Sequence, residues 1–154
     1  MQKEDLIMKS NFTIIKEEYN PNTYETVVTI HTDLGDFTGR TIADEIDSQY
    51  PSIHNGNAIA MNKALQKFAK AAIRQLKAEL KVMRNFIDSW GLVDPQDDDP
   101  YVSVFAHQYR QFRNKETELQ TWQTRLANLQ KAIQTRVKMR DDLVAKYIAK
   151  DKKD

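Results

Sequence analysis

The sequence predicts an α+β fold, in which a small three-stranded antiparallel sheet precedes a long antiparallel, coiled-coil-like two-helix hairpin. β-Branched and aromatic runs separated by turn residues occupy residues 11–42. Apolar residues then recur at the helical period over about 52–90 and again over about 101–150. Periods near two and near 3.6 residues are typical of strands and helices. We expect a head with its connector (1–51) and a helical part (52–154) that fold as one cooperative unit.

Three strands are expected, at residues 11–18, 24–32 and 37–42. The tetrapeptides 20–23 and 33–36 between them are rich in Asn, Asp, Gly and Pro, the residues that favour turns. In the second strand the period of two places four residues on one face. These are Tyr24, Thr26, Val28 and Ile30. A sheet of this size needs something packed on one face to be stable.

The first helix is expected to begin at the N-cap Ser52 and to end near Trp90, before Gly91. Its apolar residues advance by about 3.6 positions per step. They are Leu65, Ala69, Ala72, Leu76, Leu80, Met83, Ile87 and Trp90. Three small residues four apart, Gly56, Ala60 and Ala64, would let the sheet approach the first turns closely.

The second helix follows a loop rich in aspartate and proline. Its apolar face contains Phe105, Tyr109, Phe112, Leu119, Trp122, Leu126, Leu129 and Ile133. This helix is longer than the first by about 15 residues, and Val144, Tyr147 and Ile148 at its end have no partner in the hairpin. Such a chain buries little on its own, so we expect a homodimer with a shared four-helix core. A monomer whose C-terminus folds back is the alternative.

Seven basic residues form the basic stripe of the first helix. They are Lys63, Lys67, Lys70, Arg74, Lys77, Lys81 and Arg84. Steps of four and three place them on one line of an α-helix, about 30 Å long. The stripe is the candidate site for a partner or for nucleic acid, because cations at regular spacing can follow phosphates. It could also meet an acidic protein, solvent, the acidic head, or Glu116 and Glu118 of the second helix.

Catalytic, metal and membrane signals are missing from the sequence. It has no cysteine, which excludes disulfides and cysteine-based sites and agrees with a cytoplasmic location. His31, His54 and His107 lack metal-binding spacing. The aspartates at 94 and 97–99 do not fit a calcium loop and suit helix capping. No nucleophile or phosphate-loop motif occurs, and no apolar run reaches membrane length. We expect no enzyme, cofactor, metal, membrane contact or small-molecule substrate.

Short features between Thr26 and Trp90 carry a resemblance to known proteins. They are a strand over 27–32, a turn through Gly35 into residues 37–39, a polar connector, and a Ser-led helix with a lysine-rich face. This part of the chain resembles small uncharacterised proteins carried by phages and mobile elements of Gram-positive bacteria. The resemblance implies a phage or mobile-element origin and work in the cytoplasm of a bacterial host. It carries over no site residue.

These observations predict a non-enzymatic accessory protein that binds another protein, of the host or of the phage, through its helices. The first alternative is a nucleic-acid-binding protein that uses the basic stripe. A second alternative is that the acidic head, with a net charge of −6 over residues 1–50, mimics nucleic acid. The sequence leaves open which partner is bound.

Overall fold

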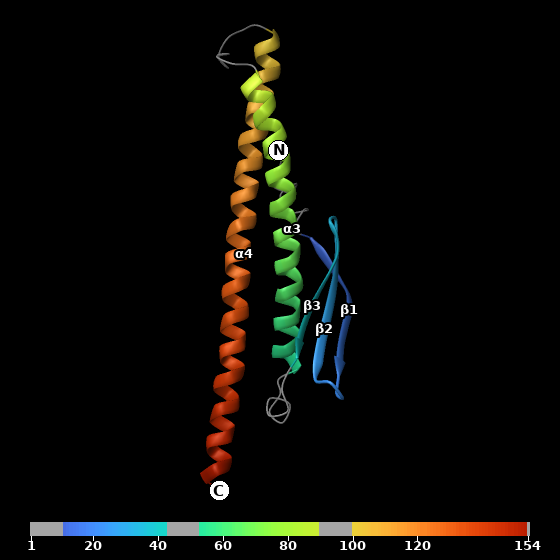
Figure 1. Ribbon diagram of the computed structural model, residues 1–154, viewed down its shortest axis with the longest axis vertical. Helices are drawn as coiled ribbons and strands as arrows, with labels where there is room; N and C mark the ends of the chain where they lie inside the picture. The colour runs from blue at the N-terminus through green and yellow to red at the C-terminus, as the bar shows by residue number, and fades with distance from the viewer. Residues whose placement is uncertain (1–10, 43–52, 90–99, 154) are drawn as a thin grey trace.

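The computed structural model describes residues 11–42, 53–89 and 100–153, which form three strands and two helices (Figure 1). The strands are β1 (Phe12–Asn20), β2 (Glu25–Thr32) and β3 (Gly35–Ile42), paired in the order β1-β2-β3. The helices are α3 (Ile53–Ser89) and α4 (Pro100–Lys153). Both strand pairs are antiparallel and the two helices pack against each other. The predicted α+β class and the helical hairpin are therefore confirmed.

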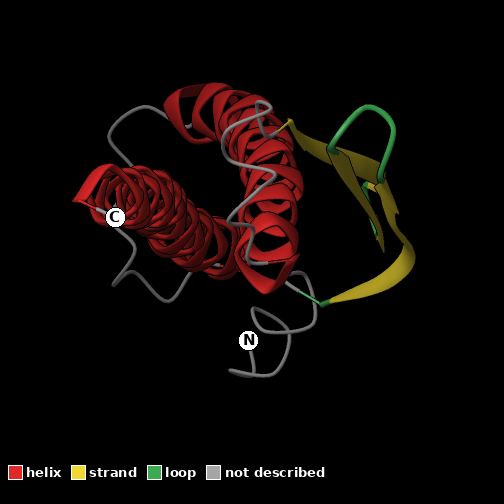
Figure 2. Ribbon diagram, turned by 90° about the horizontal axis from the view of Figure 1, so that it is seen from below, coloured by secondary structure: helices red, strands yellow, loops and turns green. Residues whose placement is uncertain are grey.

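The two helices run side by side along the long axis, and the sheet lies along the first half of α3 (Figure 1). Seen end-on, the sheet lies on the side of α3 that faces away from α4 (Figure 2). Helix α4 has 54 residues against 37 in α3 and continues past the first residues of α3, as expected. The predicted N-cap Ser52, the stop at Gly91 and the aspartate-rich loop lie outside the described residues.

The turn between β1 and β2 is held by the side chain of Asn20. Its Oδ1 accepts a hydrogen bond of 2.8 Å from the backbone N–H of Asn22. Tyr24 closes the turn with a φ of 59°, in the left-handed region, and β2 begins only at Glu25. The prediction that Tyr24 begins the second strand and shares a face with Thr26 is therefore wrong, because this residue belongs to the turn.

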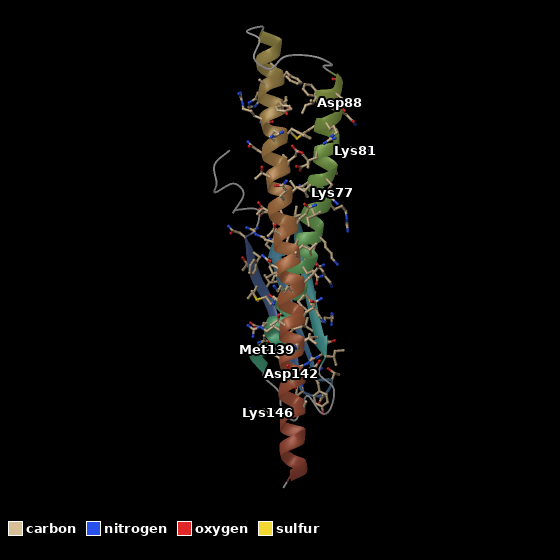
Figure 3. All side chains as sticks on the ribbon, turned by 90° about the vertical axis from the view of Figure 1, so that its left-hand side faces the viewer. Lys77, Lys81, Asp88, Met139, Asp142 and Lys146 are labelled. Carbon is tan, nitrogen blue, oxygen red and sulfur yellow. The ribbon has the colours of Figure 1, made fainter. Side chains whose placement is uncertain are left out.

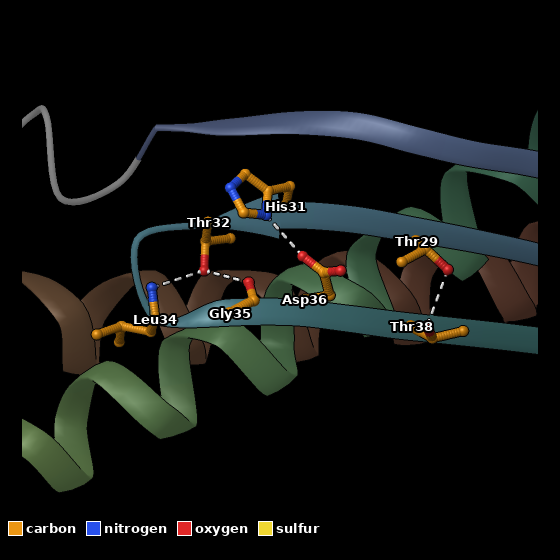
Figure 4. Close-up of polar contacts among 7 residues, drawn as sticks. All are labelled: Thr29, His31, Thr32, Leu34, Gly35, Asp36 and Thr38. Atoms are coloured by element: carbon orange, nitrogen blue, oxygen red, sulfur yellow. Dashed lines mark hydrogen bonds and ion pairs between the residues drawn. The ribbon is translucent and has the colours of Figure 1, made fainter.

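The turn between β2 and β3 is shorter than the expected tetrapeptide, because Thr32 already pairs with Gly35. The Thr32 hydroxyl donates to the Gly35 carbonyl at 2.7 Å and accepts from the Leu34 N–H at 3.1 Å (Figure 4). Gly35 has a φ of 115°, which a residue with a side chain rarely adopts. Further along the same strand pair, the hydroxyls of Thr29 and Thr38 lie 2.8 Å apart.

Small residues bring the sheet and α3 into close contact. A Cβ on Gly39 would overlap the carbonyl oxygen of Ala60 and lie 2.6 Å from the backbone nitrogen of Ala64. Both alanines are fully buried. One turn earlier in α3, a Cβ on Gly56 would lie 3.1 Å from the Thr26 hydroxyl. The predicted close approach at Gly56, Ala60 and Ala64 is confirmed, and Gly39 is the residue of the sheet that permits it.

Phe68 joins the three layers of the molecule. Its side chain is 1% exposed, and its ring centroid lies 5.7 Å from that of Phe37 in β3 and 5.0 Å from that of Trp122 in α4. Val28 and Ile30, on the face of β2 that was expected to be covered, are buried in the same cluster. The core therefore lies where the sheet, α3 and α4 meet.

The contact between the helices follows most of the expected apolar positions. Phe105, Phe112 and Trp122 of α4 are buried, and Leu119, Leu126, Leu129 and Ile133 are half-buried. Tyr109, also expected on this apolar face, is 37% exposed and lies at its margin. Its ring stacks on Phe105 and lies under the Arg113 guanidinium. None of the helices described here is long and apolar enough to cross a membrane.

Candidate functional site

The basic stripe forms on α3 as its spacing predicts. Lys63 is half-buried, and the other six residues, Lys67, Lys70, Arg74, Lys77, Lys81 and Arg84, are exposed. All seven lie within the uninterrupted helix α3, so their steps of three and four keep them on one face. Their surroundings differ along the helix, and these surroundings divide the stripe into three parts.

The first part is used inside the protein. The Lys67 ammonium donates a hydrogen bond of 2.6 Å to the Thr38 carbonyl, and the Lys63 ammonium donates one of 3.2 Å to the Arg40 carbonyl. Both carbonyls belong to β3, which is an edge strand. Unpaired edge groups invite pairing with other chains, and lysines are a common means of blocking them. Lys63 and Lys67 therefore hold α3 to the edge of the sheet.

The last part meets α4. The Arg84 guanidinium carbon lies 5.5 Å from the centre of the Phe112 ring, within the range of a cation–π contact. One turn before Phe112, the Arg113 guanidinium carbon lies 5.9 Å from the centre of the Tyr109 ring. The Arg84 end of the stripe is thus close to a second cation–π pair, in which both the arginine and the aromatic ring belong to α4. Sequence analysis did not link Arg113 to the stripe, because only the packing of the hairpin brings them together.

The middle part consists of Lys70, Arg74, Lys77 and Lys81, which we call the free cations. All four are exposed, and none has a hydrogen bond or an ion pair with any residue that the structure describes. Figure 3 places Lys77 and Lys81 along α3. From Lys70 to Lys81 the row extends about 16 Å at the helical rise. It is the longest part of the stripe without a structural role.

The acidic groups that could have neutralised the free cations lie elsewhere in the described regions. Glu25 pairs with Arg40 at 3.1 Å, and Asp36 lies 2.7 Å from the His31 ring (Figure 4). Glu79 forms an ion pair of 2.7 Å with Lys115 across the hairpin. Glu118, considered above as a partner of the stripe, is only 1% exposed. Pairing with the described acids therefore does not account for the free cations.

A second surface stands out on β1, where all nine residues are exposed. Four of the large apolar residues that are exposed in the described chain belong to this strand, within a span of eight residues. They are Phe12, Ile14, Ile15 and Tyr19. The sheet pairs β1 only with β2, and α3 packs on β2 and β3. The uncovered apolar strand is a candidate contact surface that sequence analysis missed, because an alternating pattern does not reveal which strand a helix leaves uncovered.

The histidines, which lack metal-binding spacing in the sequence, lie apart in the described regions. The His31 and His107 side chains are exposed, and His107 lies 3.1 Å from the Gln111 amide. The His54 side chain lies outside the described residues. No group of three or more His, Asp or Glu residues that could hold a metal ion occurs in the part of the chain that the structure describes.

Comparison of the chain with protein-family models, with curated proteins and with solved structures finds no match. The resemblance to phage and mobile-element proteins is not tested by these comparisons and stays a prediction. The two surfaces that stand out on the described part of the chain are the free cations of α3 and the exposed strand β1.

Proposed function

We propose that the protein is a non-catalytic nucleic-acid-binding protein and that the free cations of α3 contact the phosphate backbone. The single observation that supports this proposal is the row of four exposed cations with no partner among the described residues. The phosphates of a nucleic acid carry negative charges at regular spacing, so they can pair with such a row of cations without apolar contacts. Binding would be driven mainly by the release of counterions.

An acidic protein is a less suitable partner for this row. Protein interfaces depend on a few buried anchors, usually aromatic or large apolar side chains or arginine. Among the described side chains of α3, the exposed large apolar ones are Val82 and Phe86, and neither lies between Lys70 and Lys81. A surface with cations and without apolar anchors suits a polyanion whose charge is spread along its length. We therefore prefer nucleic acid to an acidic protein.

The proposal predicts a steep dependence of binding on salt. Four phosphate contacts imply that the affinity for duplex DNA falls about 100-fold between about 50 and about 200 mM salt. Fluorescence anisotropy of labelled duplex and single-stranded DNA measures this change directly. Binding that is absent at the lower salt, or that barely responds to salt, would contradict the proposal.

Protein binding through β1 is a second candidate, and the partner that we propose is a second copy of the chain. The exposed apolar residues of β1 and the extra length of α4 favour it. In solution the mass is then twice 17.9 kDa by light scattering. The double variant Ile14→Ser, Ile15→Ser should return the mass to that of one chain. Val82→Ser should not, although Val82 of α3 is even more exposed than the two isoleucines. A wild-type chain that stays monomeric at high concentration would exclude the dimer.

A further inference from the structure

A groove of about 490 Å³ opens between β1, α3 and α4, on a different side of α3 from the free cations. Its apolar walls include Phe12 of β1, Leu65 and Phe68 of α3, and Trp122 and Leu129 of α4. This volume lies within the range of small-molecule sites, which are mostly apolar and contain a few polar groups that fix the orientation of the ligand. The groove has this composition, because its polar side chains are Arg125 and Asn128.

Arg125 is the unusual residue of the groove. Its guanidinium lies 5.0 Å from the centre of the Trp122 ring. Its Nη1 atom is buried and has no hydrogen-bond acceptor. A buried donor without an acceptor is unfavourable, and more so when it carries charge. Arg40, by contrast, forms an ion pair with the carboxylate of Glu25. The Nη1 atom of the half-buried Arg125 side chain therefore has no acceptor among the residues that the structure describes.

We propose that the groove binds an amphipathic monocarboxylate, a ligand with one carboxylate group and an unbranched apolar chain. The carboxylate accepts hydrogen bonds from the Arg125 guanidinium, whose planar shape suits two parallel bonds to carboxylate oxygens. The apolar chain lies against Phe12, Leu65 and Leu129. Asn128 follows Arg125 by one helical turn and can offer its amide as a further donor.

The chemistry of the groove separates this site from the proposed nucleic-acid surface. A phosphate backbone brings charge at every step and little apolar surface, whereas the groove has one arginine and mainly apolar walls. A neutral apolar compound would fill the groove but would leave the Arg125 guanidinium without an acceptor. The carboxylate is therefore the part of the ligand that the structure specifies most clearly.

Trp122 lines the groove and serves as the reporter. In a full-length Trp90→Phe variant it is the remaining tryptophan, and its fluorescence is followed during titration with decanoate, kept below the micelle concentration. We expect a saturable change with decanoate and a much weaker response to decanol, which has the same chain length and no charge. Equal binding of decanol and decanoate would overturn the assignment, as would a signal that does not saturate.

Substitution of Arg125 tests the head-group contact. Arg125→Gln should weaken decanoate binding about tenfold or more, and Arg125→Lys, which keeps the charge and loses the planar fork, should bind with intermediate affinity. Arg113→Gln is the matched control, because Arg113 lies on the same helix over an aromatic ring but outside the groove. Circular dichroism establishes that each variant is folded. Unchanged affinity in a folded Arg125→Gln or Arg125→Lys variant, or an equal loss in Arg113→Gln, would refute the proposal.

Discussion

Replacing Phe68 with alanine is expected to lower the free energy of unfolding by about 3–5 kcal/mol, the range for a buried phenylalanine that leaves a cavity. Phe68 is 1% exposed and contacts both Phe37 of the sheet and Trp122 of α4. Its neighbours Ala64, Ala69 and Ala72 are too small to fill the space that the ring would leave. The variant should lose contacts on both sides of α3 at once. Urea denaturation followed by circular dichroism measures the change.

Phe86→Ala is the matched control for this prediction. Phe86 is the same residue type on the same helix, but its side chain is 40% exposed. Substitutions at such positions usually change stability by less than about 1 kcal/mol. If Phe68→Ala and Phe86→Ala shifted the unfolding midpoint equally, Phe68 would not be the residue that joins the layers.

The fold class and the helices could be predicted because they depend on local periodicity. The spacing of Ala60 and Ala64 even indicated which turns of α3 the sheet would approach. The periodicity could not show that Gly39 is the contact point on the sheet, because this contact is made between residues far apart in the chain. The turn residue Tyr24 was misplaced for a different reason. Its aromatic ring favours a strand, but its backbone N–H donates a hydrogen bond of 2.8 Å to the Asn20 carbonyl, which places Tyr24 in the turn with a positive φ.

For the basic stripe, too, the sequence predicts what depends on local spacing but not what depends on tertiary contacts. Its existence on one face follows from sequence spacing alone, but the different roles of its members do not. Lys67 donates a hydrogen bond to a backbone carbonyl of β3. The spacing of side chains in the sequence cannot predict such a contact, because every residue has a backbone carbonyl. Arg125 had a usable signal, since it follows the apolar Trp122 by three positions and so shares its side of the helix. The position of Arg125 beside the apolar face of α4 could therefore have indicated a charged group near the groove.

Reversing the charge of three free cations, in the variant Lys70→Glu, Arg74→Glu, Lys77→Glu, is expected to abolish DNA binding. Three attractive contacts with phosphate become three repulsive ones, and counterion release is lost at each. We expect affinity to fall at least about 100-fold at about 50 mM salt, with most of the salt dependence lost. The three residues are exposed and have no partner among the described residues, so the fold should be retained. Fluorescence anisotropy with the same labelled duplex measures the affinity.

The control must separate the position of the charge from its amount. Lys131, Lys138 and Lys146 are exposed and lie on α4 rather than on α3. Changing these three to glutamate alters the net charge as much as the stripe variant does. If the whole field of the protein attracts DNA, both triple variants lose affinity alike, because steering depends on total charge. If the free cations contact the phosphates, only the stripe variant loses binding. Lys63 and Lys67 are left unchanged in both, since their loss would loosen β3 from α3 and mimic a binding defect.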